Sequence, residues 1–348
     1  MPVFEHPEFD WHDQVVFCSD AATGLKAIVG IHDTRLGPAA GGCRMYPYAS
    51  FEDALTDVLR LSHGMTYKNA LAGLPLGGGK CVIIADPAAP GKAAKLRALG
   101  RHIQSLGGRY WTAVDVGIGA QDADTIAETA DFVFARASQR PPDGLATSDY
   151  TALGAFSGLR ACVKHVLGRA TLDGVRVAVQ GVGATGRELC RLLHEAGATL
   201  WISDVNADAV RAVVTETGAT SVPINEIHAQ DVDVFAPCAL GAVINDDTVS
   251  VLRARIVCGI ANNQLAEPRH GQALADRGIA YAPDYVVNAG GVISSARVIF
   301  ASMDHAAAEA QTLAIYDTVL EVLERAAKDG RTTEAIADQI AEERLAKA

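Results

Sequence analysis

The chain has 348 residues, of which 49% are hydrophobic and 20% charged, so it is long enough for two domains with sizeable cores. Its formal net charge of −11, without a basic block, argues against nucleic acid or an anionic membrane surface as a partner. Seven dispersed cysteines without a Cys/His pair at ligand spacing indicate reduced thiols in the cytoplasm and no metal site. We expect no membrane span, because no apolar run reaches about 18 residues, and no signal peptide, because the N-terminal residues have neither a basic nor an apolar region of that kind.

The first part of the chain mixes strand and helix patterns. Alternating residues predict strands over 14–20 and 25–33, and helical periodicity over 50–71 predicts a helix with Ser50 as its cap. A β-branched run then predicts a strand over 81–84. A helix that ends at glycines and a strand that ends at Asp115 follow it. The paired prolines and glycine of residues 138–144 predict a linker.

The second part is more regular. A long helix is expected over 150–168, followed by a strand, a glycine-rich turn, a helix and another strand over 175–206. Further short apolar runs end in polar or glycine residues, as in a series of βαβ units. This pattern predicts a parallel sheet covered by helices, with an amphipathic helical tail from about residue 305 to the end.

The glycine-rich turn carries a dinucleotide-binding pattern. Gly181, Gly183 and Gly186 form GxGxxG between an apolar strand and a helix, and Asp204 ends the next strand 18 residues later. A carboxylate there accepts a hydrogen bond from a ribose hydroxyl and repels a 2′-phosphate. No basic residue follows before Arg211. The pattern favours NAD over NADP, and the alternative is a glycine turn that only packs a helix on a strand.

A second glycine-rich segment, "GLPLGGGKCVII", places three glycines before Lys80, where we expect them to let a substrate lie close to the main chain. It is not a P-loop, because no Ser or Thr follows the lysine. Lys68 lies twelve residues earlier, and both lysines lie among apolar and glycine residues without a local carboxylate. Two cations in one cleft depress each other's pKa, so one could hold a substrate carboxylate while the other acts as a neutral base. Asp115 could carry a proton to solvent.

Several longer motifs resemble one enzyme family. They are "LGPAAGGCRM", "GMTYKNALAGLPLGGGK", "DVG", "QGVG", "APCALGA", "ANNQL" and "APDYVVNAGG". Together they are similar to the Glu/Leu/Phe/Val amino-acid dehydrogenase family, most closely its leucine branch and next its phenylalanine branch. The resemblance covers nearly the whole chain. It implies an α/β protein whose substrate-binding and oligomerisation domain (residues 1–140, with a C-terminal helix of about 305–348 returning to it) is separated by a cleft from a Rossmann NAD-binding domain (145–300).

The resemblance also implies roles for single residues. Lys80 would be the general base that activates water, Asp115 would shuttle the amine proton, and Lys68 would bind the substrate carboxylate beside a glycine turn at Gly41 and Gly42. The implied cofactor contacts share a place after the Rossmann strands or on the neighbouring helix. They are Thr151, Gly181, Val182, Gly183, Ala184, Thr185, Gly186, Asp204, Val205, Cys238, Ala239, Leu240, Ala261, Asn262, Asn263 and Asn288, of which Asn262 could touch the substrate instead.

The implied substrate pocket departs from the family pattern. Ala40 stands where glutamate-specific relatives have a lysine and leucine-specific ones a leucine, so glutamate is not expected as a substrate. Ser295 stands where an apolar residue is usual, while Met65, Ala113 and Val292 remain apolar. We therefore expect a roomier, slightly more polar pocket than in a pure leucine enzyme, shifted towards phenylalanine.

These features favour the reversible oxidative deamination of a branched-chain or aromatic L-amino acid to a 2-oxo acid, NADH and ammonium. Two alternatives remain open. A Rossmann reductase of another carbonyl or imine would need no paired lysines, and an NAD-binding regulatory or assembly subunit would be expected to have lost the catalytic set. Relatives are homo-oligomers, so a dimer, tetramer or octamer is expected here.

Overall fold

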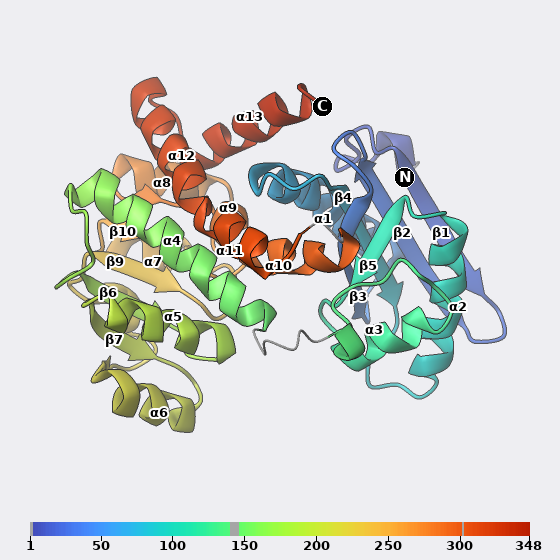
Figure 1. Ribbon diagram of the computed structural model, residues 1–348, viewed down its shortest axis with the longest axis horizontal. Coiled ribbons are helices and arrows are strands. Elements are labelled where there is room, and N and C mark those ends of the chain that lie inside the picture. Colours follow the sequence, from blue (N-terminus) through green and yellow to red (C-terminus); the bar gives the residue numbers. More distant parts are fainter. Residues whose placement is uncertain (1–2, 140–145, 301–302) are drawn as a thin grey trace. The chain divides into compact units, whose positions relative to one another are not determined.

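The computed structural model describes residues 3–139, 146–300 and 303–348, which form two compact units (Figure 1). Of the described residues, the first unit contains 3–139, 295–300 and 341–348, and the second contains 146–294 and 303–340. Most of the predicted linker at 138–144 lies outside the described residues.

The first unit has a mixed five-stranded sheet in the order β1-β2-β4-β3-β5. Strand β1 pairs antiparallel with β2 and β2 antiparallel with β4, whereas β3 pairs in parallel with both β4 and β5. The first two strands have the bounds that the sequence predicts. The strands are β1 (Gln14–Asp20), β2 (Leu25–Asp33), β3 (Ala39–Tyr46), β4 (Gly77–Ile84) and β5 (Tyr110–Ala113).

Helices cover both faces of this sheet. On one face α1 (Phe51–Leu71) packs Leu55 and Val58 against Ile28 and Val82. The Ser50 hydroxyl accepts a hydrogen bond from the backbone N–H of Asp53 at 3.0 Å, which confirms the predicted cap. On the other face α2 (Lys92–Ser105) and α3 (Ala120–Ala127) cover a second apolar cluster. The short 3₁₀ helices η1 (Val3–Glu5) and η2 (Ala137–Gln139) complete the unit.

The second unit has a six-stranded parallel sheet in the order β11-β10-β9-β6-β7-β8. Counted from β6, this is the order 3-2-1-4-5-6 of a dinucleotide-binding fold, with the topological switch point between β6 and β9. The predicted parallel sheet is therefore confirmed. The strands are β6 (Arg176–Gln180), β7 (Thr199–Ser203), β8 (Thr220–Ser221), β9 (Val234–Pro237), β10 (Ile256–Val257) and β11 (Ala280–Tyr281).

The remaining helices begin with α4 (Thr147–Leu167), which lies beside α12 in the second unit (Figure 1). The expected single C-terminal helix is instead three helices, because Ala314 separates the first from the second and Gly330, with φ 62°, ends the second. None of the helices in the described part of the chain is long and apolar enough to cross a membrane. The others are α5 (Ala184–Glu195), α6 (Ala207–Thr217), η3 (Ile227–Ala229), α7 (Asp246–Val251), α8 (Arg269–Asp276), α9 (Asp284–Val287), α10 (Gly290–Ile299), α11 (His305–Leu313), α12 (Ile315–Asp329) and α13 (Thr333–Leu345).

Candidate active site

The first unit brings Lys80 and Asp115 together. Lys80 is the fourth residue of β4 and Asp115 follows β5 by two residues, so the strand predicted to end at Asp115 is shorter than expected. The Nζ atom of Lys80 forms an ion pair with Oδ2 of Asp115, and the two side chains are only 9% and 19% exposed. A buried lysine and carboxylate in contact can exchange a proton with little movement.

Several groups hold the Asp115 carboxylate. The backbone N–H of Val116 donates a hydrogen bond to Oδ1 at 2.8 Å. Burial by itself raises the pKa of Asp115, but Lys80 and Arg44 outweigh it and leave that pKa below its ordinary value. The carboxylate is therefore held in its ionised form.

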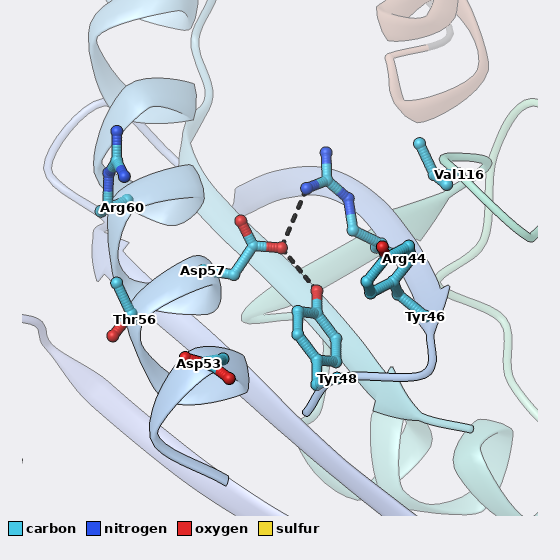
Figure 2. A pocket seen from close by; sticks show the side chains of 8 residues that line it. All are labelled: Arg44, Tyr46, Tyr48, Asp53, Thr56, Asp57, Arg60 and Val116. Carbon is cyan, nitrogen blue, oxygen red and sulfur yellow. Dashed lines mark hydrogen bonds and ion pairs between the residues drawn. The ribbon is translucent and has the colours of Figure 1, made fainter. Parts of the chain in front are cut away.

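Arg44 is a neighbour of this pair that the sequence patterns missed. Its Nε lies 3.4 Å from Asp115 Oδ2, and its Nη1 lies 2.9 Å from Asp57 Oδ2. The hydroxyl of Tyr48 donates to the same oxygen of Asp57 at 2.5 Å (Figure 2). One signal was present in the sequence: Arg44 is two positions after Gly42, so strand alternation places it on the same face of β3.

A cavity of about 460 Å³ opens beside Arg44 (Figure 2). Its lining carries two arginines and two aspartates, and it includes neither Ala40, Met65 nor Ala113. It is therefore not the predicted pocket for an apolar substrate side chain. The lining residues are Arg44, Tyr46, Tyr48, Asp53, Thr56, Asp57, Arg60 and Val116.

The three glycines before Lys80 lie inside β4, not in a turn before it, and all are buried. A Cβ atom on Gly78 would lie 2.0 Å from Thr66 Oγ1 of α1, and one on Gly79 would lie 2.7 Å from the ring of Tyr110. A Cβ on Gly77 would lie 1.9 Å from the carbonyl oxygen of Asp33. The expectation that these glycines make room for substrate is wrong, because the protein's own atoms occupy that space.

Gly41 and Gly42 likewise lie within β3, not in the expected turn. A Cβ atom on Gly41 would lie 1.8 Å from the carbonyl oxygen of Gly79 and 3.1 Å from Cγ of Met65. A Cβ on Gly42 would lie 2.4 Å from the carbonyl oxygen of Val114 and 2.9 Å from Cβ of Asp115. Both glycines therefore allow the segments that carry site residues to lie against β3.

The other predicted substrate residues are distributed over several elements. Ala40 is fully buried in β3, where it pairs with Gly78, and Ala113 ends β5 opposite Gly42. Lys68 lies on α1 three residues after Met65, so both are on neighbouring positions of one helix face. Val292 and Ser295 both belong to α10, and Ser295 is buried.

In the second unit, the GxGxxG segment has the geometry of a dinucleotide turn. Gly181 has φ +97°, which favours glycine, and a Cβ on Gly186 would lie 2.1 Å from the carbonyl oxygen of Gly181. A Cβ on Gly183 would meet nothing within 4 Å. Helix α5 begins at Ala184, inside the GxGxxG motif, so Val182, Gly183, Ala184 and Thr185 surround its N-terminus. The open glycine at a helix N-terminus fits a pyrophosphate.

Asp204 lies at the carboxyl end of β7, one residue after the strand. Its Oδ2 accepts a hydrogen bond from the backbone N–H of Val182 at 2.7 Å, and its Oδ1 accepts one from Asn206 at 2.8 Å. The carboxylate is thus tied to the glycine turn. Arg211, the next basic residue, forms an ion pair with Asp208. These contacts fit a ribose with a free 2′-hydroxyl.

More predicted cofactor residues lie at the same sheet edge. Asn262 Oδ1 accepts a hydrogen bond from Asn288 Nδ2 at 2.8 Å, and the backbone N–H of Asn263 donates to Asp284 at 2.9 Å. Asn288 Oδ1 is buried and has no hydrogen-bond partner within the described residues. An unpaired buried acceptor of this kind fits an amide N–H of a bound nicotinamide.

The carboxyl edge also exposes apolar side chains. Val205, which follows Asp204, is 89% exposed, and Leu240, three residues after β9, is 83% exposed. Cys238 and Ala239 lie between β9 and Leu240, and Ala261 is buried beyond β10. Thr151 lies on α4, where its Oγ1 would be 2.8 Å from a Cβ on Gly291 of α10. The residues present therefore fit a dinucleotide.

The parallel sheet, its open glycine turn and the unpaired Oδ1 of Asn288 define the second unit as a dinucleotide-binding domain. Two family models match the chain. One, described as the dimerisation domain of Glu/Leu/Phe/Val dehydrogenase, covers residues 12–132. The other, described as glutamate/leucine/phenylalanine/valine dehydrogenase, covers residues 202–348. The chain belongs to the Glu/Leu/Phe/Val dehydrogenase family.

Individual relatives match over almost the full length. The chain is 49% identical over 346 residues to a leucine dehydrogenase of Bacillus cereus, covering 99% of this chain and 94% of the relative. It is 46% identical to a valine dehydrogenase of Streptomyces coelicolor at the same coverage. The crystal structure of L-tryptophan dehydrogenase from Nostoc punctiforme matches with a TM-score of 0.87 at 44% identity, covering 97% and 96% of the two chains. The chain is thus an NAD-dependent amino-acid dehydrogenase.

Proposed function

We propose that the enzyme catalyses the reversible oxidative deamination of a branched-chain or aromatic L-amino acid to a 2-oxo acid and ammonium. The buried contact between Lys80 and Asp115 carries this proposal, because it supplies a base and a proton carrier in one place. The relatives named for leucine, valine and tryptophan support the choice of substrate class.

Each of three charged residues has one role in the proposed reaction. Lys68 holds the substrate α-carboxylate as a point charge. Lys80, once it has passed its own proton to Asp115, accepts a proton from the water that adds to the α-carbon of the imino acid. Asp115 Oδ2, in contact with Lys80 Nζ, exchanges the proton of the substrate amino group. NAD, when bound, supplies the hydride acceptor.

We assign the second unit's sheet edge to the dinucleotide. Residues from Gly181 to Gly186 bind the pyrophosphate, and Asp204 binds the adenine-side ribose. The exposed Val205 and Leu240 suit the faces of a planar ring. Asn288, whose Oδ1 is buried and unpaired within the described residues, accepts from the nicotinamide amide, and Asn262 and Asn263 contact its ribose or the substrate.

We further propose that the substrate pocket is wider than that of a leucine enzyme. Ala40, Met65, Ala113 and Ser295 contribute to its wall, and Ala40 leaves room for about three more carbon atoms than leucine would. Replacing Ala40 with Leu should raise the ratio of kcat/KM for leucine over phenylalanine by up to about fiftyfold, since each of three buried carbons contributes about 0.8 kcal/mol. An unchanged ratio in a folded variant would rule the assignment out.

We also propose a cytoplasmic homo-oligomer. The described residues include seven free cysteines, as in a reducing compartment. The edge strand β1 exposes Phe17, whose ring lies 5.7 Å from the exposed Phe51 of α1, and this apolar pair suits an interface between copies. Light scattering of the wild type and of Phe17→Asp would test it, because a purely monomeric wild type contradicts the proposal.

The decisive experiment measures NADH formation at alkaline pH with a panel of L-amino acids. We expect activity with leucine, valine or phenylalanine and a fall in kcat of about 10²–10⁴-fold in Lys80→Ala. Lys26→Ala is the matched control, because Lys26 is an exposed lysine on the neighbouring strand β2. A chain that binds NAD but is silent with every amino acid would instead be a regulatory subunit.

A further inference from the structure

Three potential metal ligands converge in the first unit, away from Lys80 and Asp115 in the sequence. Asp10 comes from the segment before β1, His32 from β2 and His63 from α1. The Oδ2 atom of Asp10 lies 3.6 Å from Nε2 of His32 and 3.6 Å from Nε2 of His63. All three ligand atoms lie within 4.8 Å of one another.

These distances do not correspond to hydrogen bonds. A separation of 3.6 Å is too long for an N–H···O bond. His63 Nε2 is buried, and no hydrogen-bond partner for it is found among the described residues. By contrast, two ligand atoms that each lie 2.0–2.1 Å from a tetrahedral Zn²⁺ are roughly 3.3 Å apart. The two distances from Asp10 to the histidines are therefore close to those in a coordination shell.

The surroundings of His32 orient its Nε2 as a ligand. The hydroxyl of Thr66 donates to the carbonyl oxygen of Ser62 at 3.4 Å, so it is free to accept a hydrogen bond from Nδ1–H of His32 at 2.8 Å. In that tautomer the unprotonated Nε2 faces the Asp10 carboxylate. Two acceptors then face each other, which a cation between them would stabilise.

The neighbouring rings hold the ligands in place. The ring of Tyr67 lies 4.4 Å from that of His63, and the ring of His12 lies 4.8 Å from that of His32. His12 is not a ligand, because its Nε2 lies within hydrogen-bond distance of Leu59 and Ser62.

We propose that Asp10, His32 and His63 bind one divalent transition-metal ion, with Zn²⁺ as the best match and water as the fourth ligand. The ion would fasten the N-terminal segment to β2 and to the helix that also carries Met65 and Lys68. Its role is structural and does not depend on the proposed dehydrogenase reaction. Spacing along the chain hid this site, because its ligands are 22 and 31 residues apart.

The test is to titrate the chelator-treated enzyme with Zn²⁺ by calorimetry and with Co²⁺ by visible absorption. We expect one ion per chain, tetrahedral Co²⁺ bands and a higher Tm on metal addition. His63→Ala and Asp10→Asn should each weaken binding at least tenfold and abolish the rise in Tm, and His165→Ala, at an exposed histidine of α4, should change neither. The Tm of each variant without metal verifies that it folds.

Two results would overturn the proposal. One is the absence of any saturable binding by the wild type at micromolar metal. The other is binding that persists unchanged in the folded His63→Ala and Asp10→Asn variants, which would place the ion elsewhere on the chain.

Discussion

The two glycine-rich segments of this enzyme look alike in sequence but differ in what surrounds them. In β4, a Cβ atom on Gly77, Gly78 or Gly79 would collide with other parts of the protein. In the GxGxxG segment at the start of α5, Gly181 and Gly186 are equally crowded, but Gly183 faces open space. The first segment is dense because the chain packs against itself, and the second leaves one position open to a ligand.

The difference teaches that a run of glycines is not by itself a sign of a binding surface. Glycine is required wherever main chain or a side chain approaches closely, and the approaching group can belong to the protein or to a ligand. In β4 the close approach of α1 and Tyr110 positions Lys80 on a tightly packed strand. In our proposal the functional group of β4 is the lysine side chain, whereas that of the turn is the backbone.

The largest effect should come from filling the crowded segment. In Gly78→Ala the new methyl group would meet Thr66 Oγ1 at 2.0 Å and the backbone nitrogen of Thr66 at 2.2 Å. We expect a loss of about 3 kcal/mol or more in the free energy of unfolding, measured by urea denaturation. Gly64→Ala on α1, where a Cβ meets nothing within 4 Å, should instead stabilise the enzyme by up to about 1 kcal/mol. Equal stability of the two variants would contradict this interpretation.

Adding a side chain at the open position, Gly183, should weaken dinucleotide binding without changing the stability of the fold. Gly183 has φ −63°, which alanine also adopts, so Gly183→Ala should keep the wild-type Tm. Its methyl group would occupy the space assigned to the pyrophosphate. We expect the Kd for NADH, measured by fluorescence titration, to rise about tenfold, equivalent to about 1.4 kcal/mol. Unchanged NADH affinity would show that the pyrophosphate lies elsewhere.

A smaller effect is expected at Arg44, which positions the carboxylate of Asp115. Arg44 contacts Asp57 and Asp115 through two different guanidinium nitrogens. Arg44→Lys keeps the positive charge but has only one ammonium nitrogen, so it cannot reproduce both contacts. We expect kcat to fall up to about fivefold, the scale of a partly exposed ion pair, with the Kd for NADH unchanged. A change in NADH affinity without a change in kcat would contradict a positioning role, and Arg253→Lys, elsewhere in the chain, is the control.

The smallest effect should appear in the pH dependence of stability. Lys80 and Arg44 outweigh burial and hold the pKa of Asp115 in the folded protein below its value in the unfolded chain. The ionised carboxylate therefore contributes its full stabilisation of the fold above about pH 4, and this contribution is lost as the pH falls through the folded-state pKa. The difference in unfolding free energy between wild type and Asp115→Asn should therefore be largest near pH 7 and shrink in acid. A constant difference between pH 7 and pH 3 would contradict this assignment.

Local patterns in the sequence were enough for much of the fold. The alternation in residues 14–20 and 25–33 predicted both strands with their observed bounds, and the Ser50 cap predicted the start of α1. The GxGxxG turn and Asp204 were predictable because strand, turn and helix are adjacent in the chain. Each of these features depends on neighbours a few residues apart, which a sequence displays directly.

Other features depended on contacts between distant segments. No local pattern showed that the glycines before Lys80 accommodate Thr66 and Tyr110, or that Gly41 and Gly42 belong to a strand. Arg44 was missed because its link to Asp57 and Asp115 crosses three elements.

The sequence by itself determined the α/β class, the dinucleotide turn and the identity of the lysines and aspartate, because these follow from residue type and short spacing. Only the tertiary structure decided which glycines are open and which are filled. It also brought Asp10, His32 and His63 to one point. The physical reason is that close packing and ligand convergence depend on distances in space between residues that lie far apart along the chain.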